Sequence, residues 1–167
     1  VASEMAALQY FGLEIPAAYG GAGLDSVSYA IVIEEISKAS GAMGLCISVH
    51  NSVAAFPVYE FGNESQRQTF LIAMAKGEKI GTFCLTEPNA GSDASSIETT
   101  AVRDGDEYIL NGSKIFVTNG GASGLNLIFA ITNPSKKGRE YSVFVVESER
   151  EGLEKGAQED LMGMRGN

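Results

Sequence analysis

A chain of 167 residues, 44% of them hydrophobic, can bury the core of one or two small domains, and none of its apolar runs approaches the roughly 20 residues that cross a bilayer. The formal net charge of −9 argues against nucleic acid or an anionic membrane as a partner, because both attract clustered lysine and arginine. With one histidine, and two cysteines outside any CxxC spacing, the composition predicts no metal site and favours a reducing compartment.

The first half of the chain has the apolar spacing of helices. One helix is expected over 1–13, with an abrupt start. A second is expected to begin at Asp25 or Ser26, either of which can cap its first turn, and to run to about Ala39. Because apolar side chains cover most of its circumference, we predict that this helix is largely buried.

Two further helices are expected before the pattern changes. An apolar helix over 41–56 is predicted to end at Pro57, because proline lacks the backbone N–H and clashes with the preceding turn. The next helix is predicted to begin at Asn63, which has capping-box spacing to Gln66, and to stop at Gly77.

A glycine-rich turn, Gly20-Gly21-Ala22-Gly23, follows the first helix. We interpret it as a tight connection between helices. A phosphate-binding loop is the alternative, although the turn has neither the GxGxxG spacing nor the lysine of a Walker loop.

After Gly77 the apolar period changes from that of a helix to that of a strand, so we expect a helical domain at 1–78 and a β-domain at 79–167. Strands are predicted at 80–85, 99–103, 107–110, 114–118, 125–132 and 141–147, with Asp104-Gly105 and Asn111-Gly112 as hairpin turns. The predicted fold class is α+β: part of a helical bundle, followed by an antiparallel β-barrel or pair of sheets. Lys136-Lys137-Gly138-Arg139 is predicted to be an exposed turn, with contact to a phosphate as the alternative.

Two predicted strands end in the same way. The apolar run 80–85 leads into a loop of small and polar residues that Pro88 and Gly91 prevent from continuing as a strand. The run 115–118 leads into Asn119-Gly120-Gly121. Backbone N–H groups exposed at such loops suit an anionic or polar ligand, and both strand ends could meet on one flat ligand.

These segments resemble the acyl-CoA dehydrogenase family, and specifically its short-chain, butyryl-CoA dehydrogenase-like type. The motifs that carry the likeness are Pro16-Ala17-Ala18-Tyr19-Gly20-Gly21-Ala22-Gly23, Leu85-Thr86-Glu87-Pro88, Gly91-Ser92-Asp93, Leu110-Asn111-Gly112, Phe116-Val117-Thr118-Asn119-Gly120 and Met162-Gly163-Met164-Arg165. The resemblance implies an FAD-dependent oxidoreductase of fatty acid β-oxidation that converts acyl-CoA to trans-2-enoyl-CoA and passes electrons to an electron-transfer flavoprotein. It also implies a homotetramer, in the bacterial cytoplasm or the mitochondrial matrix.

The same resemblance implies a set of cofactor-binding residues: Phe83, Leu85, Thr86, Gly91, Ser92, Phe116, Val117 and Thr118. Within this set, the Thr86 and Thr118 hydroxyls are expected to bond to the polar edge of the flavin, and the Phe116 ring to stack on its face. Ser92 is expected to contact the acyl-CoA as well.

No catalytic residue is expected in this chain. By the resemblance, Glu87 belongs to a structural loop, and the base lies in a C-terminal helical domain beyond Asn167, so we expect the 167-residue piece to be inactive alone. Cys84 is predicted to be a buried, inert thiol, and His50 not to be a base.

Two alternatives to this function stay open at the level of sequence. An acyl-CoA oxidase or a nitroalkane-oxidising relative would share the flavin site but differ in electron acceptor or substrate. A non-catalytic domain that binds acyl-CoA or a protein would keep only the scaffold.

Overall fold

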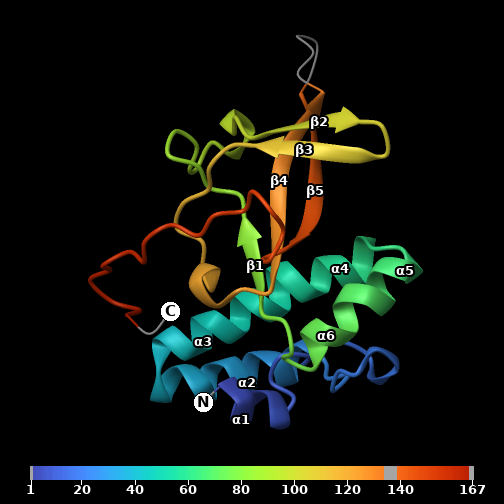
Figure 1. Cartoon of the computed structure of the whole chain (residues 1–167). Helices are drawn as coiled ribbons and strands as arrows, with labels where there is room; N and C mark the ends of the chain where they lie inside the picture. Colours follow the sequence, from blue (N-terminus) through green and yellow to red (C-terminus); the bar gives the residue numbers. More distant parts are fainter. Residues whose placement is uncertain (1, 134–138, 166–167) are drawn as a thin grey trace.

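The structure, a computed structural model, describes residues 2–133 and 139–165. Helices occupy the first half of the chain and strands the second, as Figure 1 shows. The last α-helix, α6, ends at Ala75, and the first strand, β1, begins at Gly81; two short 3₁₀ helices, η4 (Ala94–Ser96) and η5 (Gly120–Ala122), lie later in the chain. The predicted succession of a helical part and a β-rich part is therefore confirmed, whereas the division into two domains stays a prediction.

The helical half is built from α-, 3₁₀- and π-helical segments, some of which begin at a residue whose side chain accepts a hydrogen bond from the helix. Its elements are α1 (Ala2–Ala7), η1 (Ala17–Tyr19), α2 (Ser26–Ala39), α3 (Gly41–Val49), η2 (His50–Ala55), α4 (Phe56–Phe61), α5 (Glu64–Gln66), η3 (Arg67–Leu71) and α6 (Ile72–Ala75). The Asp25 carboxylate accepts a hydrogen bond from Ser28 N at 2.7 Å, and Asn63 and Gln66 form a reciprocal capping box. Both predicted helix starts are confirmed.

The prediction that α2 is largely buried is wrong. Val27 and Ile31, one turn apart, are 71% and 55% exposed. The opposite face, with Val32 and Ile36, packs against the cluster formed by Phe11 and its neighbours. A helix on the outside of a helical layer buries only one stripe of its own surface against the core. The remaining apolar residues of α2 therefore lie on the surface of the protein.

Pro57 does not end the apolar helix. The turn before it is a π-helix, η2, in which Phe56 N donates to Asn51 O five residues earlier. Widening the helix in this way gives the proline ring room where an α-turn would place a carbonyl against it.

As a result, Gly41–Phe61 is one continuous helix of 21 residues. By length and composition alone it could cross a membrane, so the prediction that no run approaches this length is wrong. Asn51, buried in this helix, accepts from Leu13 N at 3.0 Å and donates to Tyr10 O at 2.8 Å. Hydrogen bonds from a buried asparagine to the backbone of a neighbouring segment are typical of a helix in the core of a protein.

The strands of the described residues form one mixed sheet. They are β1 (Gly81–Cys84), β2 (Thr100–Asp104), β3 (Glu107–Asn111), β4 (Leu125–Asn133) and β5 (Glu140–Glu147). The pairs β4–β5 and β2–β3 are antiparallel, whereas β1 runs parallel to the start of β4 and β2 meets β4 at Ile131. The β2–β3 hairpin crosses the far ends of β4 and β5, on the side away from the helices (Figure 1).

Two local predictions in this half are wrong. Residues 114–118 are not a strand, and Asn111-Gly112 is not a hairpin turn, because no strand follows β3 directly. The physical cause lies at Phe116 and Asn119, whose φ angles of 55° and 67° are left-handed and break an extended backbone.

The main core joins the two halves. It contains Ile15, Ala54, Ala55, Val58, Leu71, Met74 and Ala75 from the helical half and Leu125 and Leu127 from β4. His50 adds a polar connection, because its Nδ1 accepts from Gly81 N at 2.8 Å while its Nε2 donates to Met74 O at 3.2 Å. This ring is fully buried and fixes the start of β1 against the helices.

Burial lowers the pKa of His50 from 6.5 to about 4, so the neutral ring is the folded form. As the pH falls, His50 is therefore protonated in the unfolded chain before it is protonated in the folded chain. The free energy of unfolding decreases by about 1.4 kcal/mol per pH unit between about pH 6.5 and pH 4. Urea unfolding across this pH range should therefore show that the free energy of unfolding of the wild type falls by about 3 kcal/mol through His50, and His50→Gln should lack this decrease. An equal slope in the two proteins would contradict this assignment.

The glycine-rich turn is a tight connection, as predicted. The N–H groups of Gly21, Ala22, Gly23 and Leu24 donate to the carbonyls of Pro16, Gly12, Ile15 and Leu13 respectively. These donors are used inside the protein, which does not support the phosphate-binding alternative.

Gly21→Ala is expected to destabilise the protein by about 1–3 kcal/mol through overpacking. A Cβ at Gly21 would lie 2.1 Å from the Ile15 carbonyl oxygen and 2.6 Å from that of Gly12. Gly121→Ala is the matched control, since a Cβ there meets nothing within 4 Å. Thermal or urea unfolding of both variants measures the difference, and equal stabilities would contradict the prediction.

Candidate functional site

Two segments that contain the ends of predicted strands lie side by side. We call residues 83–93 the Thr86 segment and residues 114–121 the Phe116 segment. Ile115 N donates to Thr86 O at 2.9 Å, and Lys114 Nζ donates to Leu85 O at 3.1 Å. The second segment is not a strand, yet the structure brings it against the first, as the sequence predicted.

The predicted site residues differ in exposure. Leu85, Thr86, Val117 and Thr118 are half-buried, and Gly91, Ser92 and Phe116 are exposed. Phe83, in β1, is half-buried and packs edge-on against Phe129, with 4.9 Å between the ring centroids. The structure therefore places Phe83 against the sheet, whereas Phe116 presents an aromatic surface to solvent.

Phe116 is 65% exposed, and its backbone has a left-handed φ. Nearby Asn119, which is buried, holds this unusual backbone in place by donating from Nδ2 to Cys46 O at 3.1 Å and Gly81 O at 3.4 Å. The Phe116 segment is thus anchored to α3 and β1. Sequence reasoning missed Asn119 as an anchor, and the available signal was that asparagine tolerates left-handed φ better than most residues.

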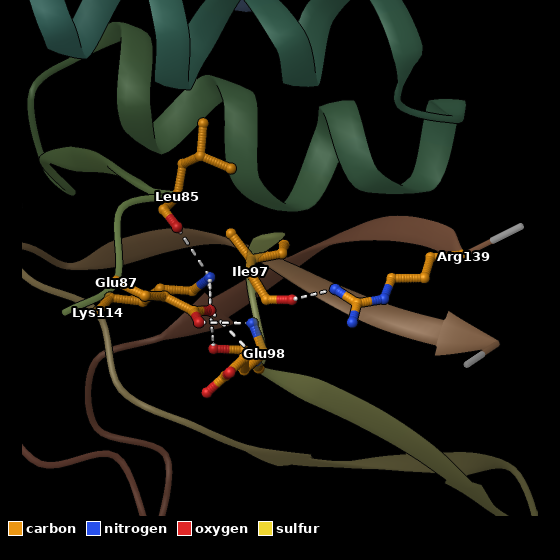
Figure 2. Close-up of polar contacts among 7 residues, drawn as sticks. Leu85, Glu87, Ile97, Glu98, Lys114 and Arg139 are labelled. Atoms are coloured by element: carbon orange, nitrogen blue, oxygen red, sulfur yellow. Dashed lines mark hydrogen bonds and ion pairs between the residues drawn. The ribbon is translucent and has the colours of Figure 1, made fainter. Parts of the chain in front are cut away.

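A buried ion pair, which sequence reasoning also missed, joins the two segments. Glu87 and Lys114 side chains are 5% and 9% exposed, with Oε1 and Nζ 2.7 Å apart. The carboxylate also accepts from Glu98 N at 2.6 Å, from Thr99 N at 3.0 Å and from the Thr99 hydroxyl. Figure 2 shows Lys114 reaching both the Glu87 carboxylate and the Leu85 carbonyl.

These contacts decide the ionisation of Glu87. Burial alone would raise its pKa, but the hydrogen bonds from Lys114, Thr99 and the Glu98 backbone outweigh burial and lower the pKa to about 2. A carboxylate with so low a pKa is a poor proton acceptor at neutral pH. The geometry therefore supports the expectation that Glu87 is structural.

Other contacts order the loop that carries Gly91 and Ser92. The Asp93 carboxylate accepts from the hydroxyls of Ser95 and Ser96, and Ser95 O accepts from Tyr141 OH at 2.6 Å. Arg139, just before β5, donates to Ser95 O at 3.3 Å and to Ile97 O at 3.4 Å, and Figure 2 shows the second of these bonds. Of the predicted turn 136–139, residues 136–138 lie outside the described residues.

A pocket of about 400 Å³ opens beside the Glu87 carboxylate. Its lining residues are Glu87, Pro88, Asn89, Glu98, Thr99, Asn111, Gly112 and Ser113. None of the predicted cofactor residues lines it, so this polar pocket is separate from the predicted contacts of the flat ligand.

The Cys84 thiol lies in the strand that leads to the Thr86 segment. It is 6% exposed, and burial raises its pKa. Both features fit the predicted inert, packed cysteine.

Comparisons with known proteins cover both halves of the chain. Residues 1–78 match the family model described as acyl-CoA dehydrogenase, N-terminal domain, and residues 82–167 match acyl-CoA dehydrogenase, middle domain. Over 154 residues the chain is 46% identical to the short-chain specific acyl-CoA dehydrogenase of Clostridium acetobutylicum, covering 92% of this chain and 41% of the relative. The chain spans about two fifths of the length of the curated relatives that it matches.

Solved structures have the same fold. A chain from the study of the electron transferring flavoprotein of Acidaminococcus fermentans matches with a TM-score of 0.93 and 44% identity, over 98% of this chain and 43% of that one. The acyl-CoA dehydrogenase of Bacillus anthracis, complexed with FAD, matches with a TM-score of 0.90 and 34% identity, over 98% of this chain and 27% of that one.

Proposed function

Since the chain belongs to the acyl-CoA dehydrogenase family, we propose that the protein containing it is an FAD-dependent oxidoreductase that converts acyl-CoA to trans-2-enoyl-CoA. The observation that carries this proposal is the hydrogen bond of 2.9 Å from Ile115 N to Thr86 O. It joins two segments that each bring a threonine hydroxyl, and one of them brings an exposed aromatic ring.

The residues present suit a flat heteroaromatic ring with a polar edge. Phe116 offers an apolar face that the chain itself leaves 65% exposed, and such a face is matched by stacking. Thr86 and Thr118, both half-buried, bring hydroxyls that can bond to ring nitrogen and oxygen atoms. When bound, FAD supplies the hydride acceptor that no amino-acid side chain provides.

Within this proposal, Gly91 and Ser92 contact the cofactor, and Ser92 contacts the substrate as well. A Cβ at Gly91 would meet nothing within 4 Å, so the backbone there is open to a close-lying ligand. The Ser92 side chain, exposed on the same loop, is assigned to the acyl-CoA. The short-chain specific relative supports a short acyl group, and the match to a chain studied with an electron transferring flavoprotein supports that class of electron acceptor.

No carboxylate of the two segments is assigned as the base that removes the substrate proton. Glu87 is held by Lys114, and Asp93 by two serine hydroxyls. We therefore propose that the 167-residue chain alone does not turn over acyl-CoA. Homotetramer formation and a bacterial cytoplasmic or mitochondrial location stay predictions.

The test is anaerobic addition of butyryl-CoA to the full-length protein, followed by visible absorption. Bleaching of a bound flavin is the expected result, and an electron-transfer flavoprotein added afterwards should reoxidise the flavin. Rapid oxygen consumption when the protein and butyryl-CoA are mixed in air would instead favour an oxidase. Absence of bound flavin after reconstitution with FAD would favour a non-catalytic scaffold and refute the proposal.

A further inference from the structure

We infer that Glu87 and Lys114 are positioning residues, which hold the Thr86 and Phe116 segments in the arrangement that receives the cofactor. This inference rests on the proposed function. Neither side chain is assigned a contact with the flavin or the substrate.

Lys114 acts on the peptide group before Thr86. Its Nζ donates to Leu85 O at 3.1 Å, and in a trans peptide the C=O and the following N–H point in opposite directions. Lys114 therefore directs the N–H of Thr86 away from itself. Because Thr86 O accepts from Ile115 N at 2.9 Å, the peptide groups on both sides of the Thr86 Cα are fixed by the Phe116 segment.

Glu87 connects this arrangement to a third part of the chain. Its carboxylate accepts from two consecutive backbone N–H groups, those of Glu98 and Thr99, just before β2 begins. Its own backbone N–H and C=O close the loop by pairing with Ala90 at 3.0 and 3.1 Å. One carboxylate thus fixes the loop after Thr86 against both Lys114 and β2.

Stability alone does not account for such a pair. Replacing a buried ion pair by apolar side chains of similar volume is often neutral or stabilising, because the desolvation cost offsets the attraction between the charges. An apolar side chain cannot donate a hydrogen bond to the Leu85 carbonyl, however. The ion pair therefore supplies directional hydrogen bonds that an apolar replacement would lack.

The double variant Glu87→Gln/Lys114→Met separates these two roles. It removes both charges, so we expect its stability to be well above that of Lys114→Met in urea unfolding. If the pair positions the site, FAD affinity of the full-length double variant stays reduced by about tenfold or more despite the recovered stability. Lys114→Arg, which keeps the charge and the donors, is expected to retain more of the affinity.

The measurements are the dissociation constant for FAD and the visible circular dichroism of the bound flavin, with each protein kept fully folded. Gly21→Ala is a control that is destabilised elsewhere, and it should bind FAD like the wild type. Recovery of wild-type FAD affinity together with stability in the double variant would overturn the inference. Failure of the wild type to bind FAD would overturn the proposed function as well, which distinguishes the two.

Discussion

Lys114→Met is expected to lower the free energy of unfolding by about 3–5 kcal/mol, because it leaves the Glu87 carboxylate buried without a counter-ion. Glu87 would still accept hydrogen bonds from Glu98 and Thr99, but these donors are neutral. The Leu85 carbonyl would lose its bond from Nζ as well. Urea unfolding at pH 7 measures the loss.

The matched control is Lys38→Met, which removes a lysine from exposed contacts with Glu34 and Glu35. Its side chain is 59% exposed, so water already screens both contacts and little change in stability is expected. Equal effects of the two substitutions would contradict the structural role of the buried pair.

The pH dependence of wild-type stability also tests the ion pair of Glu87 and Lys114. The folded pKa of Glu87, about 2, lies below the ordinary value of 4.5. Its contribution to stability is therefore fully present above about pH 4.5 and is lost as the pH falls toward 2. Most of this window lies below the one predicted for His50, so the loss of stability below about pH 4 is assigned to Glu87.

Phe116→Gly is expected to weaken FAD binding by about 1.5–3 kcal/mol, roughly 10- to 150-fold in Kd, which is the value of burying one phenylalanine ring. Folding stability should change little. The ring is 65% exposed, and glycine removes the cost of a φ of 55° while adding flexibility to the unfolded chain.

Fluorescence titration with FAD tests this expectation in the full-length protein. Phe61→Ala is the control, because Phe61 is 82% exposed on α4, in the helical half of the chain. It should bind FAD like the wild type. Unchanged affinity in Phe116→Gly would remove Phe116 from the proposed site.

Local signals in the sequence predicted two helix starts correctly, whereas the helix expected over 1–13 ends at Ala7. Asp25 and Asn63 cap helices because their side chains accept from nearby backbone N–H groups, and this chemistry depends on only a few neighbouring residues. Pro57 failed as a stop signal because a π-turn accommodates it. The exposure of Val27 could not be predicted, since burial depends on what lies against the other side of a helix.

The sequence indicated that the two segments could meet, which the structure shows, but it did not predict their backbone geometry. Loops of small and polar residues after two predicted strands marked the Thr86 segment and the Phe116 segment. The left-handed φ of Phe116 was not foreseen, because it depends on the anchoring of Asn119 by Cys46 and Gly81. The burial of Lys114 was missed for a similar reason: its partner Glu87 lies 27 residues away, and lysine in a polar turn is normally exposed.

The most direct test is a crystal structure of the full-length protein with FAD bound. The proposal predicts that the isoalloxazine ring lies across both segments, with its polar edge at the Thr86 and Thr118 hydroxyls and one face on the Phe116 ring. A flavin bound elsewhere, touching only one segment or neither, would contradict it.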